Sequence, residues 1–72
     1  MEILENVKEA VAKEADVNAD DIQMDTVFEE MGVDSLDLVA ACVTLGKKYK
    51  VRVPCMKSVQ EIVGFIEENK KV

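Results

Sequence analysis

Three stretches of this chain carry apolar residues at the spacing of one helical face, and that spacing restricts the fold more than any other feature. In residues 2–15, 35–49 and 58–70, apolar side chains recur three and four positions apart, which is the period of an α-helix. The faces expected to be buried are Ile3, Leu4, Val7, Val11 and Ala15, then Leu38, Ala41, Cys42, Leu45 and Tyr49, and finally Val59, Ile62, Val63 and Ile66. The pattern predicts an all-α fold, a small bundle of three main helices.

The segments between these helices carry local signals of their own. Residues 16–34 form a long connection rich in Asp and Asn, which favour turns and helix caps. We expect the apolar residues of this connection to pin it to the bundle, because a bare loop of this length is unusual in a compact domain. They are Val17, Ile22, Met24, Val27 and Phe28. Residues 51–54 are predicted to be extended because they lead into a proline. Ser58 and Glu61 form a capping box at the start of the last helix.

The size and composition of the chain restrict its function. Its 72 residues make a single domain, residues 1–72, without room for a core, a cleft and a separate substrate site together. The sequence contains no His, so it lacks the commonest general base and the commonest metal ligand. A small hydrolase is disfavoured because no His is available to activate Ser35. We therefore predict a module on which other proteins act, and not an enzyme.

The charge balance indicates which partners to expect. The formal net charge is −6, and an acidic domain repels nucleic acid and anionic lipid but attracts basic protein surfaces. No apolar run approaches the roughly 20 residues that cross a bilayer, and the N-terminus does not resemble a targeting segment. Cys42 and Cys55 form no CxxC pair and are interpreted as reduced thiols. We expect a cytoplasmic monomer with no nucleic-acid partner and no stable membrane insertion.

The second helix carries a further apolar stripe beside its core face. Leu36, Val39 and Val43 lie next to that face at about 100° per residue. A helix on the surface of a small bundle rarely needs two apolar stripes. The residues alone leave open whether the second stripe is additional core or a docking surface.

The stretch Gly32-Val33-Asp34-Ser35-Leu36-Asp37 is the one that points to chemistry. Asp34 is a good N-cap, and Ser35 would take the first helical position. A hydroxyl there is exposed and lies beside unpaired backbone N–H groups, which stabilise an anion such as a phosphodiester. Taken by themselves, Asp34 and Ser35 are also explained as an ordinary helix cap.

The same stretch resembles the phosphopantetheine attachment signature of acyl carrier proteins (ACPs). The resemblance extends over nearly the whole chain and includes the N-terminal helix, the long loop with Phe28, the Asp-Ser-Leu motif, Tyr49, the Val-x-Val-Pro segment and the final helix that opens with Ser58-Val59. It implies a four-helix bundle that carries 4′-phosphopantetheine covalently on Ser35, with acyl groups held as thioesters on the terminal thiol. It also implies that the transferase reads Asp34 and Leu36. The second helix is then the main recognition element, with docking residues Leu36, Asp37, Val39 and Val43.

Two departures from the family favour a specialised carrier over the general fatty-acid carrier. The exposed side of the second helix, Glu-rich in fatty-acid carriers, here has Ala40, Gly46, Lys47 and Lys48. The segment 54–58, where the family usually has a brief third helix, is short, so this helix is expected to be short or absent. The expected partners are a phosphopantetheinyl transferase and acyl-processing enzymes such as an acyl-ACP synthetase or a ketosynthase. An aminoacyl carrier, D-alanyl or peptidyl, and an unmodified acidic adaptor remain alternatives.

One acidic segment imitates a metal site. Asp16, Asn18 and Asp20 match the start of a calcium loop, but the sixth position is Asp21 and the twelfth is Val27. A calcium loop of this type needs Gly and Glu at those positions. We interpret the segment as a solvated acidic loop and predict no metal site.

Overall fold

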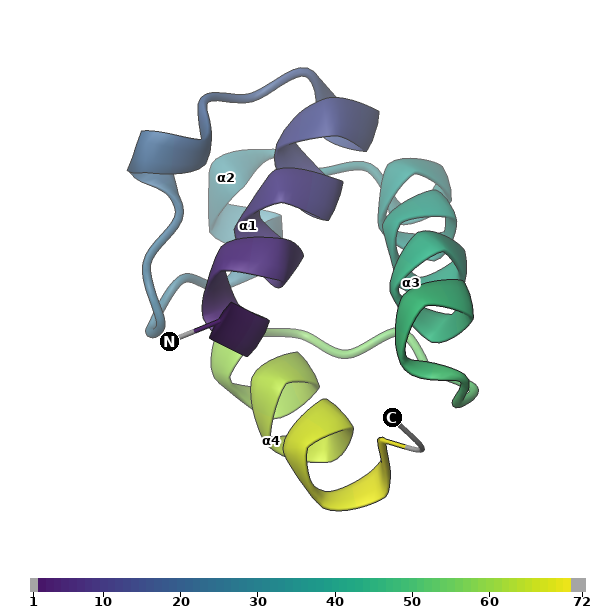
Figure 1. Ribbon diagram of the computed structural model, residues 1–72. Helices are drawn as coiled ribbons and strands as arrows, with labels where there is room; N and C mark the ends of the chain where they lie inside the picture. The colour runs from purple at the N-terminus through teal and green to yellow at the C-terminus, as the bar shows by residue number, and fades with distance from the viewer. Residues whose placement is uncertain (1, 71–72) are drawn as a thin grey trace.

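Three of the helices coincide with the three stretches predicted from the sequence. The computed structural model describes residues 2–70, with the long helices α1 (Glu2–Ala15), α3 (Ser35–Tyr49) and α4 (Val59–Asn69) (Figure 1). A 3₁₀ turn, η1 (Ala19–Asp21), and a one-turn helix, α2 (Phe28–Met31), lie between α1 and α3. The predicted bounds are confirmed for α1 and α3, and those of α4 differ by one residue at each end because Ser58 and Lys70 are its caps.

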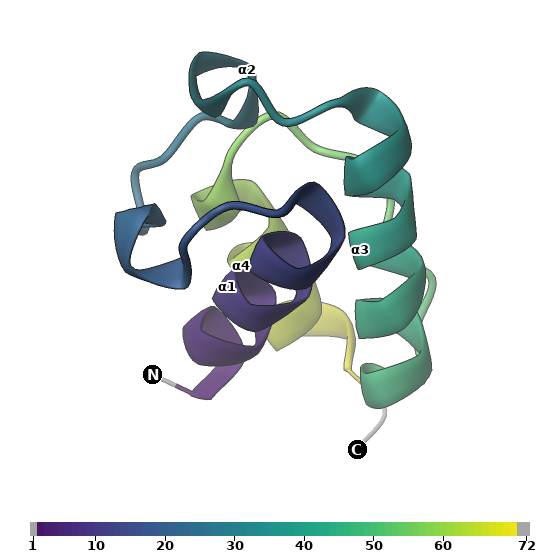
Figure 2. The same ribbon diagram turned by 90° about the horizontal axis from the view of Figure 1, so that it is seen from above.

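The first helix joins the bundle together. α1 packs against both α3 and α4, whereas α3 and α4 approach each other much less closely. Figures 1 and 2 show the same arrangement, with α3 running along one side of the molecule and α4 crossing beneath α1. The fold therefore depends on the core between α1 and each of its two neighbours.

The buried side chains agree with the predicted faces in most positions. The core consists of Ile3, Val7, Ala10, Val11, Ile22, Phe28, Ala41, Cys42, Leu45, Tyr49, Val53, Val59, Ile62, Val63 and Ile66. Leu4 and Ala15 are only partly buried at the edge of this core, and so is Leu38, which was predicted among the core residues. Ala10 is buried although the pattern did not single it out.

The connection between α1 and α3 is more ordered than the sequence pattern suggested. The side-chain oxygen of Asn18 accepts a hydrogen bond of 2.9 Å from the N–H of Asp20 and caps η1. Ile22 and Phe28 are almost fully buried, so both pin this segment to the core as predicted. Val17 and Met24 pack against the core but are only partly buried, and Val27 is partly exposed. The helical turn α2 was not predicted. It forms because a segment lying on a core must pair its own backbone groups.

The segment between α3 and α4 contains no helix at residues 54–58, in agreement with the prediction of a short or absent third helix. It pairs instead with the chain just before α2, in an isolated antiparallel bridge between Val27 and Ser58. The N–H of Phe28 donates to the carbonyl of Lys57 at 2.9 Å, and the N–H of Val59 donates to the carbonyl of Thr26 at 3.0 Å. This bridge ties the starts of α2 and α4 together.

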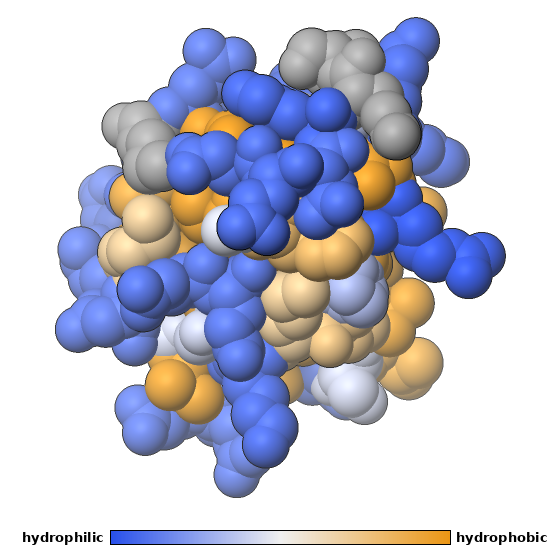
Figure 3. All heavy atoms as spheres, turned by 90° about the horizontal axis from the view of Figure 1, so that it is seen from below, coloured by the Kyte–Doolittle hydropathy of each residue, from blue (hydrophilic) through white to orange (hydrophobic). Residues whose placement is uncertain are grey.

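The surface is mixed in character. On the face seen in Figure 3, apolar side chains reach the outside between hydrophilic ones, so the small core is thinly covered there. Within residues 2–70, no helix is both long and apolar enough to cross a membrane.

Candidate functional site

A tight turn directs the chain from α2 into α3. Gly32 ends α2 in the left-handed conformation, with φ of 76°, which glycine adopts without steric cost. Its N–H donates to the carbonyl of Glu29 at 3.2 Å, and the N–H of Val33 donates to the carbonyl of Phe28 at 3.1 Å. Because these bonds close the end of α2, the first residues of α3 lie directly beside it.

The first turn of α3 has the arrangement that the sequence predicted. Asp34 is the N-cap in extended conformation, and its Oδ1 accepts a hydrogen bond of 3.4 Å from the N–H of Leu36. Its carbonyl accepts from the N–H of Leu38 at 2.9 Å, which begins the helical ladder. Ser35 is therefore the first helical residue, and it is exposed.

The hydroxyl of Ser35 differs from the other hydroxyls of the domain. Within residues 2–70 it has no hydrogen-bond partner, whereas Thr26 accepts a bond from Gln23, Thr44 donates to Ala40 and Tyr49 accepts from Asn6. The other serine, Ser58, is engaged in the capping box with Glu61 that the sequence predicted. Within the described part of the chain, Ser35 is thus the residue whose side-chain hydroxyl is left without a hydrogen bond.

A hollow of about 260 Å³ lies beside Ser35. Most of the residues that line it are apolar, and they come from four separate segments: Val27, Phe28, Glu29, Val33, Ser35, Leu38, Met56 and Lys57. Sequence reasoning assigned no site role to Val27, Met56 or Lys57. No local signal marks them, because the bridge between Val27 and Ser58 joins positions that are far apart along the chain.

The second apolar stripe of α3 is exposed. The exposed fractions are 75% for Leu36, 45% for Val39 and 52% for Val43. These are the large apolar side chains that stand out on the surface of the described residues, and Asp37 beside them is half-buried. Of the two interpretations left open by the sequence, additional core is therefore wrong.

The two cysteines have different environments. Cys42 is buried and Cys55 is exposed. Burial, followed by the neighbouring Cys55 thiol, raises the pKa of Cys42 from 9.0 to about 12. The Cys42 Sγ contacts the carbonyl oxygen of Pro54 at 3.8 Å. A neutral buried thiol of this kind is a packing group and a poor nucleophile.

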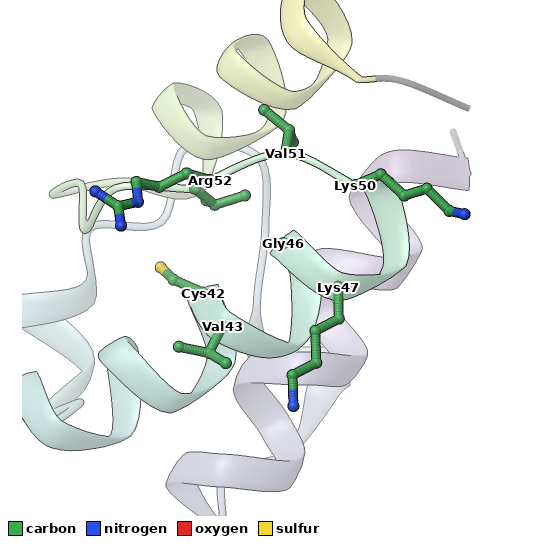
Figure 4. Close-up of a pocket in the computed structure, with 8 residues that line it drawn as sticks. Cys42, Val43, Gly46, Lys47, Lys50, Val51 and Arg52 are labelled. Atoms are coloured by element: carbon green, nitrogen blue, oxygen red, sulfur yellow. The ribbon is translucent and has the colours of Figure 1, made fainter.

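A second hollow lies at the opposite end of α3 from Ser35. It measures about 450 Å³ and is formed between the last turns of the helix and the chain that follows it. Figure 4 shows Lys47, Lys50 and Arg52 around it, with their charged ends spread apart. No group of three Asp, Glu or Cys side chains within residues 2–70 is arranged to hold a metal ion. This holds for the acidic connection between α1 and α3 as well.

Comparison with known families shows to which family the chain belongs. The family model for the phosphopantetheine attachment site matches residues 5–66. The chain belongs to the phosphopantetheine-binding acyl carrier family. It carries acyl groups as thioesters on covalently attached 4′-phosphopantetheine.

Individual relatives are similar to this carrier over their whole length. The acyl carrier proteins of Wolinella succinogenes and Helicobacter hepaticus are each 32% identical to it, covering 97% of this chain and 100% of the relative. That of Campylobacter jejuni subsp. doylei is 30% identical over 99% of this chain and 100% of its own. These matches therefore include almost all of this chain.

Proposed function

We propose that Ser35 is the residue to which the phosphopantetheine arm is attached. The observation that carries the proposal is the free hydroxyl: among residues 2–70, Ser35 alone has a side-chain hydroxyl without a hydrogen bond, and it is exposed. A transferase needs both properties, because the hydroxyl oxygen must reach the phosphate of the donor. Ser58, the other serine, would have to break its capping box first.

The surroundings of Ser35 suit the group chemically. The first-turn N–H groups of α3 and the positive end of its dipole favour the negative charge of a phosphodiester on Ser35 Oγ. Asp34 holds the helix start in place through its bond to the N–H of Leu36, and we assign Asp34 and Leu36 to recognition by the transferase. When attached, the arm supplies a terminal thiol that holds the acyl group.

The hollow beside Ser35 supports an apolar cargo. Val27, Phe28, Val33, Leu38 and Met56 give it an apolar lining, and a ligand site is usually apolar with a few polar groups that orient the ligand. A D-alanyl or peptidyl group would gain little from such a lining. This observation favours an acyl cargo over the aminoacyl alternative, and an unmodified adaptor would leave both the free hydroxyl and the hollow without a use.

The partners follow from the exposed stripe on α3. The exposure of Leu36, Val39 and Val43 supports docking there. We assign these residues, with Asp37 at the edge, to docking by a phosphopantetheinyl transferase and by acyl-processing enzymes such as a ketosynthase or an acyl-ACP synthetase. We propose that the protein is a monomeric cytoplasmic carrier and not an enzyme. The cations at the end of α3 support a specialised carrier with partners of its own.

The attachment site is tested by intact mass after incubation with coenzyme A and a phosphopantetheinyl transferase of broad specificity. The wild-type protein should gain one phosphopantetheine and Ser35→Ala none. Ser58→Ala is the matched control and should gain one, although loss of the cap costs about 1 kcal/mol of stability. An unmodified wild type, or modified Ser35→Ala, would contradict the proposal.

A further inference from the structure

The charges of this carrier are segregated along the chain. Residues 16–37 contain eight carboxylates and no cation, whereas residues 38–60 contain five cations and no carboxylate. α3 begins in the first segment and ends in the second. At its start lie the exposed Asp34 and, on the adjoining α2, the exposed Glu29 and Glu30. The helix that bears the free serine therefore connects an acidic end of the domain to a basic end.

The exposed stripe of Leu36, Val39 and Val43 lies between the acidic end and the basic end of α3. Leu36 and Val43 are seven residues apart, or about two helical turns, so they lie on the same side of α3, and Lys47 follows one turn later. Lys50 and Arg52 continue beyond the helix, around the hollow of about 450 Å³ that Val43 also lines (Figure 4). Along its length α3 thus leads from an acidic start, past an exposed apolar stripe, to a group of cations.

The cations of this group have no carboxylate partner within residues 2–70. The only ion pair in that part of the chain joins Lys8 and Glu5, at 3.5 Å. The negative end of the helix dipole accounts for a cation at Lys47. It does not account for Arg52, which lies beyond the helix. On a chain with a net charge of −6, three unpaired cations beside one hollow leave positive charge available to another molecule.

We propose that α3 presents a two-ended docking face, and that the enzyme that loads or unloads this carrier bears carboxylates opposite Lys47, Lys50 and Arg52. The same enzyme bears cations opposite the acidic start of α3, about 20 Å away at 1.5 Å per residue. Opposite charges at the two ends determine which way round the enzyme sits, because the reversed orientation brings like charges together. This inference rests on the proposed attachment at Ser35, since the orientation matters only if the arm begins there.

The test measures binding with Ser35→Ala carriers, so that it does not depend on loading. The probe is an acyl carrier-dependent ketosynthase with a cationic docking patch, in its native form and in a form with Glu in place of the cations farthest from its active-site entrance. Binding is measured by fluorescence anisotropy at low salt, where screening is weakest. The carrier should bind the Glu-bearing enzyme about tenfold more tightly than the native enzyme. K47E/K50E should reverse this preference.

The matched control is K13E/K48E. Lys48 lies on the same helix but faces α1, where it lines a separate hollow with Lys13. Each pair of substitutions changes two cations to anions and so lowers the net charge by the same amount, and circular dichroism checks that both variants fold. K13E/K48E should keep the wild-type preference. Equal binding of both enzyme forms by the wild type, or a reversal by K13E/K48E, would overturn the proposal. Loss of modification at Ser35 in the mass assay would overturn the attachment site alone.

Discussion

Cys42 shows how burial in the core changes the acidity of a single side chain. Its pKa of about 12 lies well above the ordinary value of 9.0 because burial penalises the thiolate. Only about one thiol in 10⁴ is then ionised at pH 8, against roughly one in ten for an ordinary thiol. Iodoacetamide at pH 8 should therefore alkylate Cys55 and leave Cys42 unmodified for hours in the folded protein, as peptide mass mapping would show. Equal labelling of the two would contradict the buried environment.

The same pKa makes stability dependent on alkaline pH. Between pH 9 and 12 the unfolded chain loses the Cys42 proton while the folded protein keeps it, so the free energy of unfolding decreases with rising pH. Below pH 9 both states are protonated and the full stability is present. Urea unfolding at pH 8 and pH 10.5 should show a smaller loss for Cys42→Ala than for wild type. An identical loss in both proteins would contradict the prediction.

Two glycines in helices should respond to alanine in opposite directions. A Cβ at Gly46 would lie 2.7 Å from the carbonyl oxygen of Val51, whereas a Cβ at Gly64 would meet nothing within 4 Å. Gly46→Ala must displace the backbone after α3 and should cost about 1–3 kcal/mol. Gly64→Ala should stabilise the protein by about 0.5–1 kcal/mol through helix propensity. Chemical denaturation measures both changes. Stabilisation by Gly46→Ala would show that the backbone after α3 moves aside easily.

At the scale of elements, the exposed stripe of α3 can be separated from the core by substitution. Val39 is 45% exposed, so Val39→Glu should change stability by no more than about 0.5 kcal/mol. It should lower the transferase kcat/KM about tenfold, equivalent to ~1.4 kcal/mol, because it places a charge in the proposed docking contact. Circular dichroism and modification rates give the two readouts.

Thr44→Glu is the control for this substitution. It adds the same charge at an exposed position of α3 that lies outside the stripe, facing the α1 side. Its modification rate should remain close to that of wild type. If Val39→Glu unfolds, or if both variants slow modification equally, the stripe is not the docking surface.

At this scale, a contact could be predicted from the sequence when its two residues lie close together along the chain. The caps at Asp34 and Ser58 use partners two and three residues away, so they were predictable from local motifs. α2 was missed because a single turn has no periodicity, and it depends on the buried Phe28 and the left-handed Gly32. The hollow was missed as well, since Met56 reaches it only through a pairing between distant segments.

At the scale of the whole molecule, stability should depend on the cargo. A domain of this size has a small stability margin, and an acyl chain that enters the hollow beside Ser35 gains up to ~0.8 kcal/mol per buried CH₂. Because it binds the folded state alone, the chain must stabilise the fold. The melting temperature should rise from the apo and holo forms through acyl forms of increasing length, by roughly 4–8 °C per kcal/mol, and level off when the hollow is full.

A variant with a larger side chain in the hollow beside Ser35 tests whether the acyl chain binds there. Met56 lines the hollow, so Met56→Trp should fill part of its volume and weaken the dependence on chain length. A flat series in the wild type would mean that the cargo stays in solvent. A series that climbs as steeply in Met56→Trp as in the wild type would place the chain elsewhere, for example between α3 and α4.

The bridge between Val27 and Ser58 has a consequence for how the cargo leaves. Two backbone hydrogen bonds join two of the segments that line the hollow, and a typical bond of this kind contributes about 0.5–1.5 kcal/mol. Breaking both costs roughly 1–3 kcal/mol, so about 1–15% of the molecules would be open at any moment, while α1, α3 and α4 stay packed. We expect an acyl chain held in the hollow to leave through this minor state, without unfolding of the domain and without the enzyme having to force it open.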